Sequence, residues 1–318
     1  MRQRCTGLSP PKTSSIALRK ALLPSITNSR HHAYSKGPRG AVIARGEFFT
    51  AMINEEDHLR LQVLKAGCQL SQCAAQINRI DDMIEQKVDF AFSPRYGYLT
   101  ACPTNVGTGI RVSVMLHLPA LKMTGQIEKF FTAAKDMNLA VRGLFGEGTE
   151  AAGDLYQMSN QVTLGLSEPE IVRRFEQTII PEVVEYENAA RSHLLSKQVD
   201  TLDDKISRAM ALLQNANLIS SQEALFLLSH LRLGINMYRH MGATTPAIQR
   251  LCRLTGPTGG QERTSASSVE PQKGLSVATI NRLFMLTLPA HLQLNYGKPL
   301  DPSHRDALRA RIIRDALI

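Results

Sequence analysis

Three short segments of this 318-residue chain combine arginines with acids or glycines in a way that suits phosphate chemistry. NEEDHLR, residues 54–60, places three consecutive acids ahead of an arginine. CPTNVGTGIRVSVM, residues 102–115, and RGLFGEGTE, residues 142–150, each join an arginine to a stretch punctuated by glycines. Phosphoryl transfer requires cations around the phosphates and a group that orients the nucleophile. The segments predict such a site, although no Walker motif and no kinase HRD or DFG motif occurs.

Each segment also has a simpler explanation when it is taken alone. NEEDHLR could be a solvated charged turn with a chance arginine, and the glycines could serve ordinary turns. A turn does not explain why Arg111 enters an apolar strand, where a fork-shaped guanidinium suits phosphate oxygens. Packing of a hydrophobic core does not require three such segments, so their joint presence favours a functional site.

The elements that must position these segments indicate an α+β fold. Short β-type runs are expected at residues 47–53, 90–92, 98–102, 111–118, 139–145 and 155–162. An amphipathic helix is expected at residues 69–86, and a further helix is expected at residues 121–137. Strands mixed with helices, without a strict βαβ rhythm, predict a mostly antiparallel sheet flanked by helices.

After residue 167 the pattern predicts an all-helical C-terminal part. SEPE at residues 167–170 is a capping box that opens a helix to about residue 196. Further helices are expected at 199–216, 220–239, 276–286 and 302–317, with a Gly/Ser/Thr-rich linker at 255–274. We therefore expect three regions: a basic and disordered leader (1–36), a catalytic domain (37–190) and a helical regulatory domain (191–318).

The formal charge of +9 comes from the first segment of the chain. Nine of the 37 Lys and Arg residues lie in residues 1–45, which hold no Asp or Glu, so 28 cations face 28 acids in the rest. A general nucleic-acid binder is expected to carry a basic face on its folded domain, so this class is disfavoured. The leader could instead be a transit peptide, whose composition it matches.

The cysteines and the apolar runs predict a cytoplasmic protein. Five scattered cysteines form no CxxC pair and no metal-ligand spacing, which is typical of reduced intracellular thiols. The best apolar run, residues 112–121, is too short to span a bilayer.

The three segments, in this order and spacing, resemble the catalytic domain of the ATP:guanidino phosphotransferases, which include creatine and arginine kinases. The resemblance is close over residues 37–190. It implies that Glu56 and Glu147 hold and help deprotonate a substrate guanidinium, and that Cys102 tunes the site. It also implies ATP as phosphoryl donor, with Mg²⁺ bridging phosphate oxygens and no metal ligand from the protein. The ATP-binding residues implied in this way are Arg60, Arg111, Val112, Ser113, Val114, Met115, Arg142, Gly143, Leu144, Phe145, Gly146 and Glu147.

The chemistry of a guanidinium fits these carboxylates. A guanidinium is a poor nucleophile because its lone pairs are delocalised and it stays protonated at neutral pH. Two carboxylates that grip its fork and favour loss of a proton supply what it lacks.

The long helical C-terminal part makes the chain similar to the bacterial protein-arginine kinases within this family. Metabolite kinases of the family, a less favoured alternative, carry a small helical domain before the catalytic one. RDALRA, residues 305–310, fits an R-D-x-x-R-A signature that in this group binds phosphoarginine as an allosteric signal. The resemblance therefore implies a phosphoarginine site at Arg305, Asp306, Arg309 and Ala310.

The resemblance also implies binding partners, and the sequence departs from the family pattern at one point. Protein substrates with exposed arginines are expected, together with an activator protein, a Clp-type protease that degrades the marked proteins, and a homodimer. The S-R-I-R-type segment with which the family opens is not found in residues 1–36, so we expect an incomplete phosphate clamp. An alternative is a catalytically impaired relative that acts as a phosphoarginine-binding regulatory protein.

Overall fold

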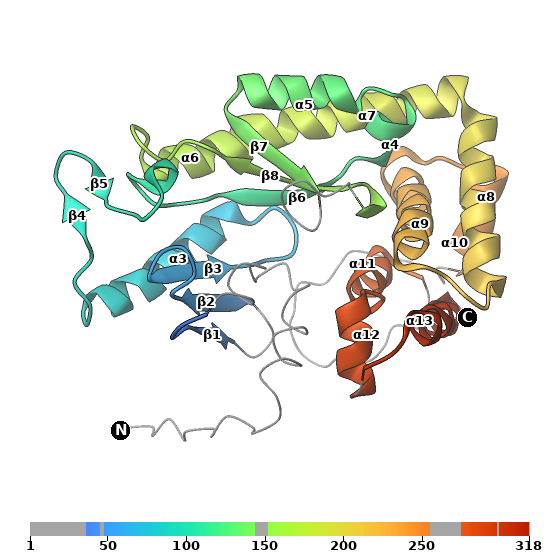
Figure 1. Cartoon of the computed structure of the whole chain (residues 1–318). Helices are drawn as coiled ribbons and strands as arrows, with labels where there is room; N and C mark the ends of the chain where they lie inside the picture. Colours follow the sequence, from blue (N-terminus) through green and yellow to red (C-terminus); the bar gives the residue numbers. More distant parts are fainter. Residues whose placement is uncertain (1–35, 45–47, 144–151, 255–274, 298, 318) are drawn as a thin grey trace, which may run out of the picture.

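The computed structural model describes residues 36–44, 48–143, 152–254, 275–297 and 299–317 (Figure 1). The strands and α3 occupy one side of the molecule, and α8 to α13 form a helical group on the other (Figure 1). The long helix α7 runs between the two sides (Figure 1). Strands mixed with helices, followed by a helical C-terminal region, confirm the predicted α+β class.

The first sheet surrounds the acid-rich NEEDHLR turn. Its strands β1, β2 and β3 pair antiparallel in chain order. Asn54 takes the left-handed conformation (φ 55°), and its backbone N–H donates to the carbonyl of His58 at 2.9 Å, which closes a β2–β3 hairpin. The predicted strand before NEEDHLR is therefore half of a hairpin, and β1 and β3 were missed. The strands are β1 Gly40–Ile43, β2 Phe49–Ile53 and β3 Leu59–Val63.

The second main sheet has the order β6-β8-β7, with all pairs antiparallel. Tyr156 and Met158 of the central strand are buried on one face against the helices. A small two-stranded sheet precedes this unit, so the described part of the chain holds three small sheets in place of one continuous sheet. The strands are β4 Phe92–Ser93, β5 Gly97–Tyr98, β6 Ser113–His117, β7 Leu139–Gly143 and β8 Leu155–Asn160.

The helix expected at 121–137 is two helices, α4 Pro119–Met123 and α5 Ile127–Asp136. Gly125 lies between them with φ 71°, a conformation that ends a helix and favours glycine. The prediction of one helix was wrong because the apolar spacing continues across this break. The helix predicted at 69–86 is confirmed as α3 Leu70–Glu85.

The capping box predicted at residues 167–170 is present. The Ser167 backbone N–H donates to the Glu170 carboxylate at 2.8 Å, and α6 (Glu168–Arg174) begins there. The helix continues through a π-helical turn, η3 (Phe175–Ile179), into α7 (Ile180–Lys197). Pro181 has no N–H to donate to residue 177, which explains why the hydrogen bonding widens at this turn.

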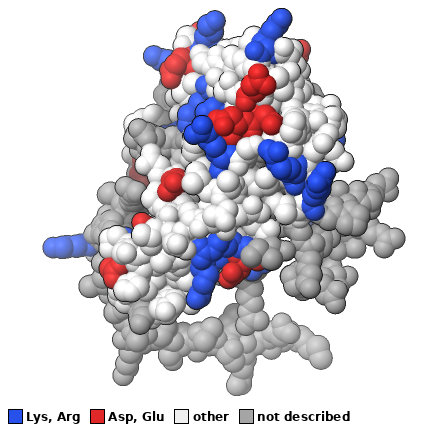
Figure 2. Space-filling view, turned by 90° about the vertical axis from the view of Figure 1, so that its right-hand side faces the viewer, with Lys and Arg blue, Asp and Glu red and all other residues white. Residues whose placement is uncertain are grey.

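The C-terminal helices pack around α9, whose buried residues lie on several of its faces. Two of these helices, α10 and α12, were not predicted. No helix in the described ranges is long and apolar enough to cross a membrane. Acidic and basic side chains are interspersed on the face shown in Figure 2. The helices are α8 Val199–Asn215, α9 Ser221–Met241, α10 Pro246–Leu254, α11 Val277–Leu286, α12 Pro289–Tyr296 and α13 Pro302–Leu317.

Candidate phosphoryl-transfer site

The two glutamates of NEEDHLR have different environments. The Glu55 side chain is only 6% exposed, and its Oε2 accepts from Arg60 Nη1 at 3.4 Å and from the Glu56 backbone N–H at 2.9 Å. Arg60 lies on β3 opposite the buried Met52, and its side chain is 40% exposed. The Glu56 side chain is exposed, and its carboxylate has no hydrogen-bond partner among the described residues. Glu55 therefore orients Arg60, while Glu56 can receive a ligand.

A hydrogen bond joins this turn to the segment that carries Cys102. Asp57 Oδ1 accepts from the backbone N–H of Ala101 at 2.6 Å, across 44 residues of sequence. Cys102 Sγ lies 2.9 Å from Thr104 Oγ1, and the Cys102 carbonyl accepts from Thr100 Oγ1 at 2.7 Å. The structure thus brings the predicted Glu56 and Cys102 segments side by side.

The glycine-rich stretch before β6 approaches neighbouring backbone very closely. Gly107 has φ 117°, and a Cβ placed there would lie 2.4 Å from the Thr163 carbonyl oxygen. Gly97 has φ 78°, and a Cβ placed there would lie 2.4 Å from the Gly107 carbonyl oxygen. Three backbone segments stack here, so both positions require glycine for space as well as for φ.

Arg111 is held by the central strand of the second sheet. Its Nη2 and Nε donate to Ser159 Oγ at 2.8 and 3.2 Å. Ser159 is 1% exposed, whereas Arg111 is an exposed residue. The buried hydroxyl therefore fixes the direction of a guanidinium that reaches the surface.

Arg142 lies on the same face of this sheet as Arg111. In the register, Met115 on β6 and Arg142 on β7 both pair with Gln157 on β8. Directly paired residues project to one side of a sheet, and alternate residues share that side. Arg111, Ser113, Met115 and Arg142 therefore share one face, which forms a candidate phosphate-binding surface.

Of the remaining predicted nucleotide residues, the structure describes three and does not describe the other four. Val112 is 7% exposed and Val114 is partly buried against the core, so their side chains lie on the opposite face. Gly143 ends β7 and is buried. The segment Leu144, Phe145, Gly146 and Glu147 lies outside the described residues, so the role of Glu147 stays a prediction.

Sequence reasoning missed Ser159 and Asn160. Asn160 Oδ1 accepts from the Val112 N–H at 2.8 Å, and its Nδ2 donates to the carbonyls of Ile110 and Val162 at 3.1 Å. This one amide holds the segment just before β6 that carries Arg111. The available signal was a Ser-Asn pair at the end of an apolar strand, which also fits an ordinary turn.

The predicted phosphoarginine residues are placed differently from one another. Arg309 is 1% exposed, and it donates to the carbonyls of Thr287 (2.8 Å) and Ile219 (2.6 Å) and to Asp306 Oδ1 (2.5 Å). Burial lowers its pKa, and the Asp306 hydrogen bond opposes that shift. Arg305 is half-buried and donates to the Leu300 carbonyl at 3.0 Å, while Ala310 is fully buried. The two guanidinium groups do not share one exposed surface, because Arg309 points into the helical core, so a phosphate contact would require Arg309 to exchange its present acceptors.

Comparison with known proteins supplies the family. Residues 4–190 match the family model described as ATP:guanido phosphotransferase, C-terminal catalytic domain. Residues 199–273 and 268–318 match the model described as Protein-arginine kinase McsB C-terminal domain.

Individual relatives agree with these matches. The chain is 40% identical to a protein-arginine kinase of Halothermothrix orenii over 94% of this chain and 76% of that protein. It is 42% identical to one from Desulforamulus reducens, over 88% of this chain and 69% of the relative. A taurocyamine kinase structure from Schistosoma mansoni overlaps 54% of this chain and 25% of that chain, with 28% identity and a TM-score of 0.46. On the family model and these identities, the chain belongs to the ATP:guanido phosphotransferase family.

Proposed function

We propose that this protein transfers the γ-phosphoryl group of ATP to arginine side chains of proteins. The observation that carries the proposal is the shared sheet face of Arg111 and Arg142, with Ser159 fixing the Arg111 guanidinium. Two guanidinium groups on one face match the negative charge of a triphosphate. The names of the relatives supply the acceptor, since they are protein-arginine kinases.

In the proposed reaction, a guanidinium nitrogen of the substrate forms a bond to the γ-phosphorus. The bond from that phosphorus to the bridging oxygen breaks, ADP leaves, and the nitrogen gives up one proton. Glu56, whose exposed carboxylate has no partner among the described residues, is assigned to hold the guanidinium and favour loss of that proton. Arg60, Arg111 and Arg142 stabilise charge on the phosphates. Mg²⁺ accompanies ATP and screens its phosphates, and we assign it no ligand from the protein.

The other assignments in this proposal follow the same family. Glu147 is the second carboxylate, Cys102 tunes the site, and Arg305, Asp306, Arg309 and Ala310 receive phosphoarginine once Arg309 releases its carbonyl partners. Phosphoarginine formation in the cytoplasm would mark proteins for a Clp-type protease. An activator protein and a homodimer complete the proposal.

The test is incubation with γ-labelled ATP and an arginine-rich protein such as casein. We expect acid-labile label on the protein, and we expect the Glu56→Gln variant to lose it while retaining ATP binding. Glu182→Gln, an exposed carboxylate on α7, is the matched control and should behave as wild type. Absence of acid-labile label would reject the kinase assignment, and faster labelling of free arginine than of protein would favour a metabolite kinase.

A further inference from the structure

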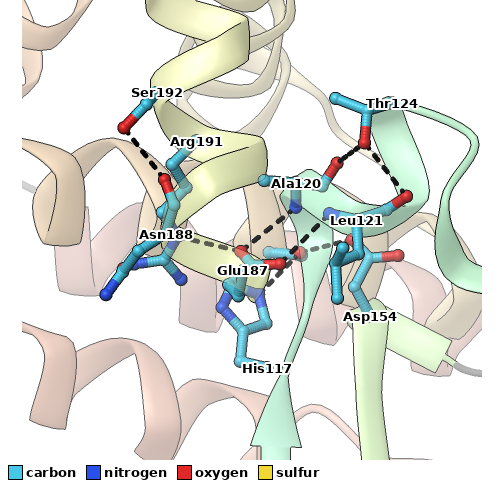
Figure 3. A network of polar contacts seen from close by, with 10 residues as sticks. His117, Ala120, Leu121, Thr124, Asp154, Glu187, Asn188, Arg191 and Ser192 are labelled. Atoms are coloured by element: carbon cyan, nitrogen blue, oxygen red, sulfur yellow. Dashed lines mark hydrogen bonds and ion pairs between the residues drawn. The ribbon is translucent and has the colours of Figure 1, made fainter. Parts of the chain in front are cut away.

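A buried polar network links the second sheet to helix α9. Figure 3 shows two of its members, His117 and Asp154. Asp154, immediately before β8, accepts from Lys122 Nζ at 2.8 Å and from Ser229 Oγ of α9 at 2.6 Å. His117, the last residue of β6, places its Nε2 2.8 Å from the same Ser229 oxygen. Ser229 is fully buried, and Asp154 and His117 are 4% and 8% exposed.

The direction of these hydrogen bonds follows from the number of protons. Ser229 has one hydroxyl hydrogen, and Asp154 can only accept when it is ionised. Ser229 therefore donates to Asp154, and its oxygen accepts from the His117 Nε2–H. Burial and nearby Arg232 lower the pKa of His117, which favours the neutral imidazole. That imidazole then carries its proton on Nε2, as the hydrogen bond to Ser229 requires. One hydroxyl of α9 thus joins the ends of two strands.

The backbone is packed tightly at the same place. Leu118 N–H donates to the Asp154 carbonyl at 3.0 Å. Gly153 has φ 66°, and a Cβ there would lie 2.9 Å from the Phe284 ring and 3.0 Å from the Leu225 carbonyl oxygen. Because Leu225 belongs to α9 and Phe284 to α11, the start of β8 has little freedom to move independently of these helices.

The opposite ends of the same two strands carry the candidate phosphate site. β6 and β8 pair from His117 and Leu155 at the α9 end to Ser113 and Ser159 at the other. This span is about 13 Å at the usual rise of a strand. Arg111 donates to Ser159 just beyond it, so a shift of β8 at Asp154 would move the acceptor that orients Arg111.

Helix α9 is in turn tied to α13. Ile219, two residues before α9, donates its N–H to the Asp306 carbonyl at 3.3 Å, and its own carbonyl accepts from Arg309 Nη1 at 2.6 Å. Ser229 lies ten residues further along, about 15 Å of helix. A continuous set of contacts therefore runs from α13 to the sheet through α9.

We propose that Ser229 is a positioning residue through which the C-terminal helices hold the β6–β8 strand pair, and with it the Arg111 guanidinium, in the arrangement that binds phosphate. The proposal rests on the proposed function, because Arg111 is assigned there to the ATP phosphates. In this proposal the helical region affects nucleotide binding through the strand pair that it holds.

The test compares Ser229→Ala with Ser207→Ala in the full chain. Ser207 is the matched control because its hydroxyl accepts from Arg250 within the helical region and has no hydrogen bond to the strands. Amide hydrogen exchange is measured on peptides covering residues 110–117 and 155–160, and the Kd for MgATP is measured by calorimetry. Ser229→Ala should speed exchange in both strands by about tenfold and raise the Kd by about three- to tenfold. Ser207→Ala should change neither.

The hydrogen-exchange rates of the Ser229 variants and the affinity for MgATP decide whether the proposal holds. Unchanged exchange in β6 and β8 of a folded Ser229→Ala variant, or faster exchange confined to α9, overturns the proposal. If Ser229→Ala does not fold, Ser229→Cys, with a similar shape and a weaker donor, is used for the same comparison. If the wild type binds no MgATP, the proposed function fails, whereas the exchange rates still decide whether α9 holds the strands.

Discussion

The guanidinium of Arg111 donates two hydrogen bonds to the hydroxyl oxygen of Ser159, at 2.8 and 3.2 Å. Because Ser159 is buried on the central strand of its sheet, it holds the long side chain in one direction before any ligand binds. Holding a flexible arginine in place reduces the entropy lost on binding. The pair therefore predicts a preorganised phosphate contact.

Removing the serine should weaken nucleotide binding more than it slows transfer. Ser159→Ala is expected to raise the KM for ATP by about three- to tenfold, since one hydrogen-bonding group is worth about 1 kcal/mol. Arg111→Ala should lower kcat by about 10³ or more, as for other phosphate-stabilising arginines. Steady-state kinetics measure both, with the exposed Ser192→Ala as control. Equal losses in the two variants would show that Ser159 does more than orient Arg111.

The two glutamates of NEEDHLR should differ when each is changed to glutamine. Glu55→Gln removes the charge that pairs with Arg60 and should mainly raise the KM for ATP by severalfold. Glu56→Gln should abolish transfer with little change in ATP affinity, because it is assigned to the guanidinium. Measuring ATP affinity by direct titration and phosphoryl transfer by steady-state kinetics separates these two effects. If Glu55→Gln abolished transfer and Glu56→Gln mainly weakened ATP binding, the roles assigned to the two glutamates would have to be exchanged.

Arg309 should be a stabilising residue of the helical region whatever it binds. Arg309→Ala leaves Asp306 and two buried carbonyls without their donor and is expected to cost about 3–5 kcal/mol of unfolding free energy. Arg305→Ala, at a half-buried position with one hydrogen bond to Leu300, should cost about 1 kcal/mol. Urea denaturation provides the comparison. Similar small losses at both positions would contradict the buried geometry.

The buried histidines predict a loss of stability in mild acid. Burial lowers the pKa values of His117 and His230, so the unfolded chain binds these protons more readily than the native protein. Stability is then fully present above the unfolded pKa, about 6.5, and falls below it by up to about 1.4 kcal/mol per pH unit for each histidine.

The His117→Gln variant isolates the contribution of this histidine. Burial raises the pKa of Glu187, which acts in the opposite direction, so the difference between wild type and variant is the informative quantity. Urea denaturation from about pH 7 to about pH 5.5 should give a shallower slope for His117→Gln. The exposed His193→Gln should leave the slope unchanged. Parallel curves for wild type and His117→Gln would remove His117 as the cause.

Local signals predicted some elements well and others poorly. The capping box at Ser167 and the long helices were readable because hydrogen-bonding residues and apolar spacing repeat within a few positions. Strands β1 and β3 were missed because they are only four and five residues long. The pairing of β3 also depends on the hairpin turn at Asn54. The break at Gly125 was missed because a continuous apolar period conceals a single left-handed residue.

The site was predictable in its charged residues but not in the groups that hold them. Arg111 and Arg142 could be proposed from sequence, yet their common face follows from a register that only the pairing with β8 defines. The supporting residues Ser159, Asn160 and Asp57 have ordinary local sequences, and their partners lie 44 to 50 positions away. The inward orientation of Arg309 also depends on carbonyls from two distant segments.

The close stacking of the backbone at Gly97, Gly107 and Thr163 limits which residues can occupy the two glycine positions. A side chain at either glycine would collide with main chain, which no rotamer change can relieve. Replacement of Gly107 therefore requires a shift of the backbone at Thr163 and Leu164, and replacement of Gly97 requires a shift of the backbone at Gly107. Sequences that keep this stacking should therefore keep glycine at both positions, whereas the contact sets no requirement on the side chain at position 163, because only its main chain takes part.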